Sequence, residues 1–225
     1  MRAFPAAVFL WTVPAMAQER PPNILEIYRD FVRPGSEGAF REVEENAARI
    51  CAQMGFPHHH LAIESLRGPN EVWWLNGFAS KAEIQQVADA YAGNPELAAA
   101  LGANGRRKQA LTGAPVDVYA VYRADLSRGA RWKLAGARFF VVTVTRDDPR
   151  GEGSVFEAPD GDRFVFRSAA TRGEADALAG TAGPDARTFA VRPYWGMPAP
   201  EWIAADPGFW KINPTASRSE RRKSP

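Results

Sequence analysis

The stretch that most constrains the fold is residues 64–83, ESLRGPNEVWWLNGFASKAE. It predicts a strand, a turn at residues 68–70, a second strand through EVWWLNGF, and a helix that begins at Ser80. Ser80 and Glu83 have the spacing of a capping box, in which each side chain satisfies a backbone donor in the first helical turn. The stretch therefore predicts one hairpin followed directly by one helix.

A shorter copy of this pattern recurs at residues 156–179, FEAPDGDRFVFRSAATRGEADALA. Its turn is at residues 159–161, and its capping box pairs Thr171 with Glu174. An internal repeat of this kind predicts two related structural units within one chain.

The order of elements in the first unit, residues 18–123, predicts a ferredoxin-like fold. A strand through NILEIYRDFV precedes a helix that Gly55 ends, and the hairpin follows. The next helix is interrupted at Gly93-Asn94-Pro95, and a final strand is VDVYAVYR. This β-α-β-β-α-β order is the split unit that forms a four-stranded antiparallel sheet with helices on one face.

The second unit, residues 137–210, is expected to be a truncated β-β-β-α-β copy that ends in a Trp-rich segment. Residues 124–136 are expected to be a connector, and residues 211–225 a disordered basic tail. Two sheets covered by helices on one side only each leave a bare face, and packing those faces together hides both. We therefore predict an α+β protein whose two antiparallel sheets pack as a pseudo-dimeric α/β barrel.

The N-terminus has the layout of a secretory signal peptide over residues 1–17. Arg2 supplies a positive end, residues 3–14 are largely apolar, and Ala15-Met16-Ala17 forms an A-x-A cleavage site. The apolar run is shorter than the ~20 residues that span a bilayer. We expect an exported protein, periplasmic or secreted, with no stable membrane insertion after cleavage.

Charge and cysteine content argue against several functional classes. The formal net charge is +2, and residues 211–225 hold five basic residues against one acidic residue, so the basic excess lies in a tail and nucleic-acid binding is not expected. The single cysteine, Cys51, excludes an intrachain disulfide. No G-x-S-x-G or C-x-x-C motif occurs, and Gly151-x-Gly153 precedes a predicted strand, so no cofactor is expected.

Residues 23–123 resemble the dimeric α/β-barrel superfamily, which includes antibiotic-biosynthesis-monooxygenase-like and NIPSNAP-like domains. The resemblance lies in the element order, the interrupted second helix, and an aromatic-rich third strand that ends in Asn76. It implies a ligand pocket inside the barrel, and cofactor-independent oxidation of an aromatic substrate. Tyr28, Trp74 and Asn76 are the residues that strand position carries over, and the protein is expected to be a monomer or a homodimer.

Alternation along the strands selects the residues expected to face that pocket. On the first strand Leu25 and Ile27 suit the helix side, which leaves Glu26 and Tyr28 for the pocket. On the hairpin's first strand, Leu61 and Ile63 likewise suit the helix side, which leaves His58, His60 and Glu64 on the other face.

On the following strand we favour Trp74 and Asn76 over Trp73, because burying Asn76 under helices would cost desolvation. Glu26, Trp74 and Asn76 are therefore predicted to bind the ligand. His60, paired with Glu64 or Tyr28, is predicted to be an acid–base group. A metal site at His58, His60 and Glu64 is not expected, because the chain has only three histidines to complete a ligand shell.

Three functional hypotheses follow from these features. The first is an exported protein that binds a small aromatic or apolar ligand in the barrel pocket. The second is a cofactor-independent monooxygenase-like oxidoreductase on the same scaffold. The third is a partner-binding or structural module with no ligand site. A convergence of His60, Glu64 and Tyr28 would favour the enzyme, whereas an interior filled by aromatic side chains would favour the third.

Overall fold

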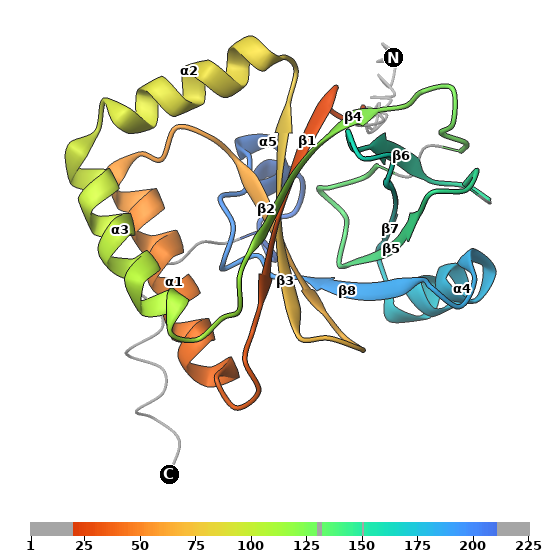
Figure 1. Ribbon diagram of the computed structural model, residues 1–225, viewed down its shortest axis with the longest axis horizontal. Coiled ribbons are helices and arrows are strands. Elements are labelled where there is room, and N and C mark those ends of the chain that lie inside the picture. Colours follow the sequence, from red (N-terminus) through yellow and green to blue (C-terminus); the bar gives the residue numbers. More distant parts are fainter. Residues whose placement is uncertain (1–19, 130–131, 150, 211–225) are drawn as a thin grey trace, which may run out of the picture.

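Eight strands form one closed antiparallel barrel in the order β1-β3-β2-β8-β5-β7-β6-β4, as a computed structural model shows (Figure 1). The structure describes residues 20–129, 132–149 and 151–210, so the expected signal peptide and basic tail lie outside it. The strands are β1 (Ile24–Phe31), β2 (His60–Ser65), β3 (Glu71–Phe78), β4 (Val116–Tyr122), β5 (Phe139–Thr145), β6 (Ser154–Glu157), β7 (Arg163–Ala169) and β8 (Arg187–Val191). The predicted α+β class and the barrel are confirmed.

Each half of the chain contributes four neighbouring strands. The first half supplies β4-β1-β3-β2 and the second supplies β8-β5-β7-β6, so both follow the order fourth, first, third, second. The halves join at two short seams. β2 pairs with β8 from Ile63↔Val191 to Ser65↔Phe189, and β4 pairs with β6 only at Val121↔Glu157 and Tyr122↔Phe156.

The helices cover the outside of the barrel. In Figure 1, α1 (Glu37–Met54), α2 (Lys81–Ala92) and α3 (Pro95–Gln109) lie beside the first half, and α4 (Arg172–Ala182) lies on the opposite side of the molecule. A short helix, α5 (Pro200–Ala205), follows β8. None of the helices in the described ranges is long and apolar enough to cross a membrane.

Local sequence signals explain where these helices begin and end. Ser80 Oγ accepts a hydrogen bond from the Glu83 amide at 3.2 Å, and the Glu83 carboxylate accepts one from the Ala79 amide at 2.6 Å. Thr171 and Glu174 make the same cap on α4. These are the two predicted capping boxes, and they satisfy amides that a helix start otherwise leaves unpaired.

The barrel interior is a packed core to which both halves contribute. An eight-stranded barrel is just wide enough for side chains to fill it. The fully buried residues of this core include Leu25, Ile27, Leu61, Ile63, Trp73, Phe140, Phe156, Phe166 and Phe189. The aromatic rings contact one another mostly edge to face; the centroids of Phe156 and Phe166, for example, are 5.9 Å apart.

This core overturns the predicted facing of the first-half strands. Leu25, Ile27, Leu61 and Ile63 were expected to lie under the helices, but they point into the barrel. The reason is that the interior must be filled from both halves and holds the most apolar residue set of each strand.

Two segments outside the barrel strands complete the core. Trp132, in the expected connector, is buried and lies 5.2 Å from the Phe156 ring. At the other end of the chain Trp210 Nε1 donates to the Ala135 carbonyl at 2.8 Å, and its ring lies 5.5 Å from that of Trp202. These tryptophans close one end of the barrel.

Candidate functional site

The residues predicted to line the barrel pocket lie instead on the outer face of the first-half sheet. Cross-strand partners on β1 and β3 are Glu26↔Asn76 and Tyr28↔Trp74, and His60 on β2 is the partner of Asn76. The structure thus brings these five residues onto one face, as expected, but the expected side of the sheet was wrong. That face lies under α1–α3, where Trp74 packs with Phe40 of α1.

On this face Asn76 has a hydrogen-bond partner, the Glu26 carboxyl. The prediction that Asn76 would avoid the helix side assumed that it had no such partner. A hydrogen bond with Asn76 lowers the pKa of the Glu26 carboxyl, although burial is the larger effect and raises it overall. Tyr119 on β4 also donates its hydroxyl to Glu26 Oε1 at 2.5 Å. Asn76 is only partly buried, so the cost of placing it on the helix side is small.

A buried ion cluster occupies the space between β1 and helices α1 and α3. Lys108 Nζ lies 2.8 Å from Asp30 Oδ2 and 3.4 Å from Glu44 Oε1, and 4.5 Å from the centre of the Trp74 ring. Burial raises the pKa of Glu44 to about 7, against the opposing charge of Lys108. Tyr28 also borders this cluster, with its ring centre 5.3 Å from Lys108 Nζ. Tyr28 and Trp74 therefore serve as packing partners of a buried cation.

His60 and Glu64 do not form the predicted acid–base pair. Glu64 Oε2 accepts a hydrogen bond from Arg192 Nε and forms an ion pair with the same guanidinium. The His60 ring packs against Phe56 at 5.6 Å, and its Nδ1 is buried without a hydrogen-bond partner among the described residues. Burial lowers the pKa of His60 to about 4, so the ring is neutral at pH 7. Within the described ranges, no hydrogen bond, ion pair or ring contact joins His60, Glu64 and Tyr28.

The described residues contain no group of three or more His, Cys, Asp or Glu side chains placed to hold a metal ion. His58, which was weighed as a metal ligand with His60, instead stacks on Phe78, with ring centroids 4.5 Å apart and planes 4° apart. Its Nε2 is buried and has no hydrogen-bond partner within the described ranges. Burial lowers the pKa of His58 below its usual value.

A recess of about 380 Å³ lies beside His58 at one mouth of the barrel. Its apolar wall consists of inward-facing strand residues and side chains of the closing segments, and its rim is polar. The wall is Leu25, Leu61, Leu75, Trp132, Leu134, Ala199 and Trp202, and the rim carries Arg20, His58, His59 and Glu201. This recess is the candidate functional site.

The segment after β8 positions one side of the recess. β8 pairs with β2 only as far as Ile63, and the chain then continues along β2, where the amides and carbonyls of His60 and Met197 bond to each other at 2.9 Å. The backbone comes so close at Gly196 that a Cβ atom there would lie 2.5 Å from the His60 carbonyl. Glycine at this position lets α5 and Trp202 reach the barrel mouth.

The sequence analysis did not identify this recess. Trp132 lies in a segment without periodicity, and His58 was considered only for metal binding. The one available signal was the occurrence of tryptophan in the expected connector and in the Trp-rich terminal segment, because large aromatic side chains bury much apolar surface and so indicate packing against the core.

Comparison with known proteins adds distant structural similarities only. No protein-family model matches the chain, and no curated protein matches it significantly. A protein of Fusobacterium nucleatum provisionally named a monooxygenase has a TM-score of 0.47 and 12% identity, covering 77% of this chain and 94% of its own. A protein of Lactobacillus acidophilus with the same provisional name has a TM-score of 0.46 and 10% identity, with coverages of 75% and 93%.

A mutant chlorite dismutase from Candidatus Nitrospira defluvii is also similar, with a TM-score of 0.43, 9% identity, and coverages of 78% and 93%. Similarities this distant do not assign a function. The fold assignment rests on the strand order of the closed barrel, and neither of the two families named from the sequence is identified by these matches.

Proposed function

We propose that the protein is an exported binding protein that holds a small aromatic or apolar molecule at the barrel mouth. The observation that carries this proposal is the recess itself, whose 380 Å³ falls within the range of about 300–1,000 Å³ that is usual for small-molecule sites. Its composition, an apolar wall with a few polar groups on one side, is also typical of such sites.

His58 supplies a specific recognition group. His58 lines the recess, and its buried Nε2 has no hydrogen-bond partner within the described ranges; because buried polar atoms almost always have one, we take this nitrogen as the atom that the ligand would bind. Burial lowers the pKa of His58, which keeps the imidazole neutral at pH 7, and the unprotonated nitrogen of a neutral imidazole accepts a hydrogen bond from a hydroxyl group. A phenol-like ligand, with its ring in the apolar recess and its hydroxyl at His58, fits both features.

The other two hypotheses gain less support. Monooxygenase-like chemistry was assigned to Tyr28, Trp74 and Asn76, which do not line the recess. A purely structural role is supported by the filled interior, but it leaves the recess and His58 Nε2 without a use. We further propose that each half is a ferredoxin-like unit, the second lacking its first helix. Because one chain closes the barrel, a monomer is sufficient to form the site.

Fluorescence titration with 2-naphthol and with naphthalene tests this proposal. Trp132 and Trp202 line the recess, so a bound aromatic molecule should change their emission. We expect 2-naphthol to bind with a Kd below about 1 mM and more tightly than naphthalene. His58→Phe keeps a ring stacked on Phe78 but removes Nε2, and should abolish the preference for 2-naphthol.

Two further variants make the test specific to the recess. Tyr194→Phe changes an exposed aromatic residue that does not line the recess and should leave both affinities unchanged. Glu201→Trp places a large side chain on the exposed rim without altering the core, and should weaken both probes. Absence of binding, or equal binding by the wild type and Glu201→Trp, would refute the proposal and favour the structural module.

A further inference from the structure

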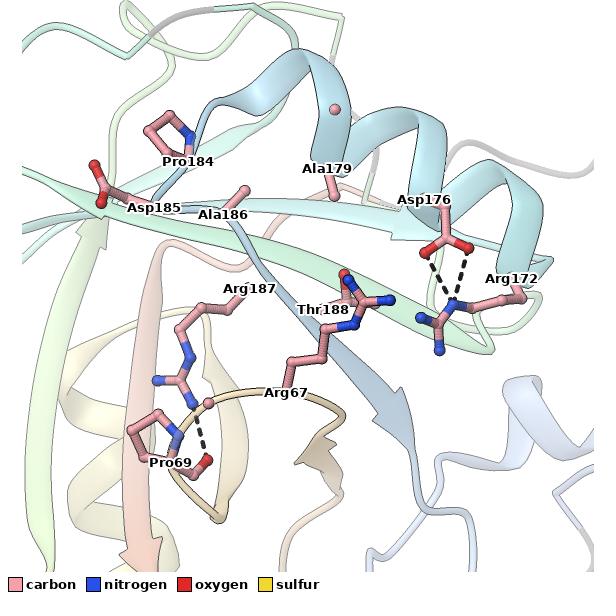
Figure 2. A pocket seen from close by; sticks show the side chains of 12 residues that line it. Arg67, Pro69, Arg172, Asp176, Ala179, Pro184, Asp185, Ala186, Arg187 and Thr188 are labelled. Atoms are coloured by element: carbon pink, nitrogen blue, oxygen red, sulfur yellow. Dashed lines mark hydrogen bonds and ion pairs between the residues drawn. The ribbon is translucent and has the colours of Figure 1, made fainter.

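Three arginines from separate elements meet at a cleft of about 820 Å³ (Figure 2). The cleft lies where β2 ends and β8 begins, whereas the barrel-mouth recess lies at the start of β2. Arg67 lies in the turn after β2, Arg172 begins α4, and Arg187 begins β8. The cleft shares no lining residue with the barrel-mouth recess.

Arg187 contributes positive charge that its partners neutralise only in part. Its Nη1 lies 2.8 Å from Glu71 Oε1, while Arg29 Nη2 lies 2.8 Å from Oε2 of the same carboxylate. Burial alone would raise the pKa of Glu71, but hydrogen bonds from Trp73 and Arg29 and the charge of Arg187 hold it below its usual value. One ionised carboxylate is thus shared by two guanidinium groups, and one positive charge remains.

Arg187 also has hydrogen-bonding capacity to spare. Its Nη2 donates to Ser65 Oγ at 3.1 Å and to the Pro69 carbonyl at 3.3 Å, which fixes the guanidinium beside the turn. Its Nε is buried and has no partner in the part of the chain that the structure describes. The group is therefore held in place with one donor unused.

Arg67 is the arginine whose charge is most available. It is exposed, and no hydrogen bond or ion pair engages its guanidinium within the described ranges. Figure 2 shows this guanidinium extending toward the pair formed by Arg172 and Asp176, in which Arg172 Nε lies 2.9 Å from Asp176 Oδ1. Asp185, the other acidic residue of the cleft, lies at its far end (Figure 2).

Small residues keep the space between these arginines open. Ala179 and Gly180 of α4 and Ala186 before β8 form the facing wall. A Cβ atom added at Gly180 would have no atom within 4 Å, so side chains there would extend into free space. The cleft is therefore accessible to a ligand larger than a single ion.

We infer that this cleft binds a small organic polyanion that carries at least two phosphate or carboxylate groups. The guanidinium group presents a planar fork of donors that matches both anions, and hydrogen bonds between ionised partners are stronger than neutral ones. Arg67 and Arg187 offer two separate contact points, and the volume lies within the range of ligand sites. Phosphate and carboxylate groups both present negatively charged oxygen atoms that accept hydrogen bonds from a guanidinium group, and the inference rests on this shared property.

Isothermal titration calorimetry with pyrophosphate and with citrate tests the inference, at an ionic strength of about 0.15 M so that weak surface attraction is screened. The full-length wild-type protein should bind at least one probe with a Kd below about 1 mM, and the preferred probe identifies the anion type. Arg67→Ala should raise that Kd about tenfold, because a charge-assisted contact is lost.

Arg107→Ala is the matched control, because it removes the same charge from an exposed position on α3 and should leave the Kd unchanged. Gly180→Trp should fill the cleft and raise the Kd, while its melting temperature should not fall, since tryptophan is a better helix former than glycine. Failure of the wild type to bind either probe, or equal losses in Arg67→Ala and Arg107→Ala, would overturn the inference.

Discussion

Replacement of Glu44 by glutamine should change how stability depends on pH. Glu44 is 3% exposed and its carboxylate faces Lys108 of α3 and Asp30 of β1. Because one lysine is shared by two buried carboxylates, ionising both leaves a buried negative charge. Burial is the largest cause that raises the pKa of Glu44 from 4.5 to about 7; the charge of Lys108 opposes this rise, and the charge of Asp30 adds to it.

The sign and size of the effect follow from linkage. Between pH 4.5 and 7 the folded protein binds a proton at Glu44 more tightly than the unfolded chain does, so the free energy of unfolding falls as pH rises through this window. A shift from 4.5 to about 7 corresponds to about 3.5 kcal/mol at most, since one pKa unit is about 1.4 kcal/mol. Above pH 7 the loss is complete.

Urea denaturation of the wild type and Glu44→Gln from pH 4 to pH 8 measures this pH-dependent contribution of Glu44 to the free energy of unfolding. Glutamine imitates the protonated carboxyl, so the variant should match the wild type at pH 4 and exceed its stability by up to about 3.5 kcal/mol at pH 8. Glu42→Gln, at an exposed position on the same helix, should follow the wild type throughout. Parallel curves for the wild type and Glu44→Gln would refute the reasoning.

Two further predictions concern the core and His60. Phe166→Ala should cost about 3–5 kcal/mol of unfolding free energy, because Phe166 is fully buried in the barrel, whereas Tyr194→Ala, at a side chain that is 54% exposed, should cost about 0.5 kcal/mol or less. Equal losses in thermal or urea melts would contradict the assigned core. In the wild type the free energy of unfolding should fall as pH falls from 6.5 to about 4, because burial lowers the pKa of His60 and the histidine is therefore protonated first in the unfolded chain. His60→Gln should remove this loss of stability. His59→Gln is its exposed control, and a wild-type-like pH profile for His60→Gln would contradict the assignment.

Local signals allowed much of the fold to be predicted from the sequence. The two capping boxes at Ser80 and Thr171 bond as expected, and Asn94 caps α3 by accepting from the Leu97 amide at 3.1 Å. These interactions join residues only three apart, so composition and spacing are sufficient to reveal them. The element order followed from the same signals.

The candidate site could not be predicted, because it depends on which face of each strand is turned inward. On β1 alternation separates the apolar pair Leu25 and Ile27 from Glu26 and Tyr28, but it does not tell whether the apolar pair faces the helices or the barrel interior. The choice is decided by long-range partners. Lys108, about eighty residues along the chain from Tyr28, gives the outer face its buried cation.

The connector posed a similar problem. Trp132 has no periodic neighbours, and its burial is visible only when Phe156 and Phe166 surround it. A site assembled from a strand face, a connector and a terminal segment therefore has no continuous sequence signature. It becomes apparent only in the folded chain.

A crystal structure of the protein with 2-naphthol tests the central claim most directly. We predict electron density for the ring between Leu61, Trp132 and Trp202, with its hydroxyl within hydrogen-bond distance of His58 Nε2. Density against Tyr28 and Trp74 in the helix-covered layer, with an empty barrel mouth, would contradict the account and return the site to the face that the sequence first suggested.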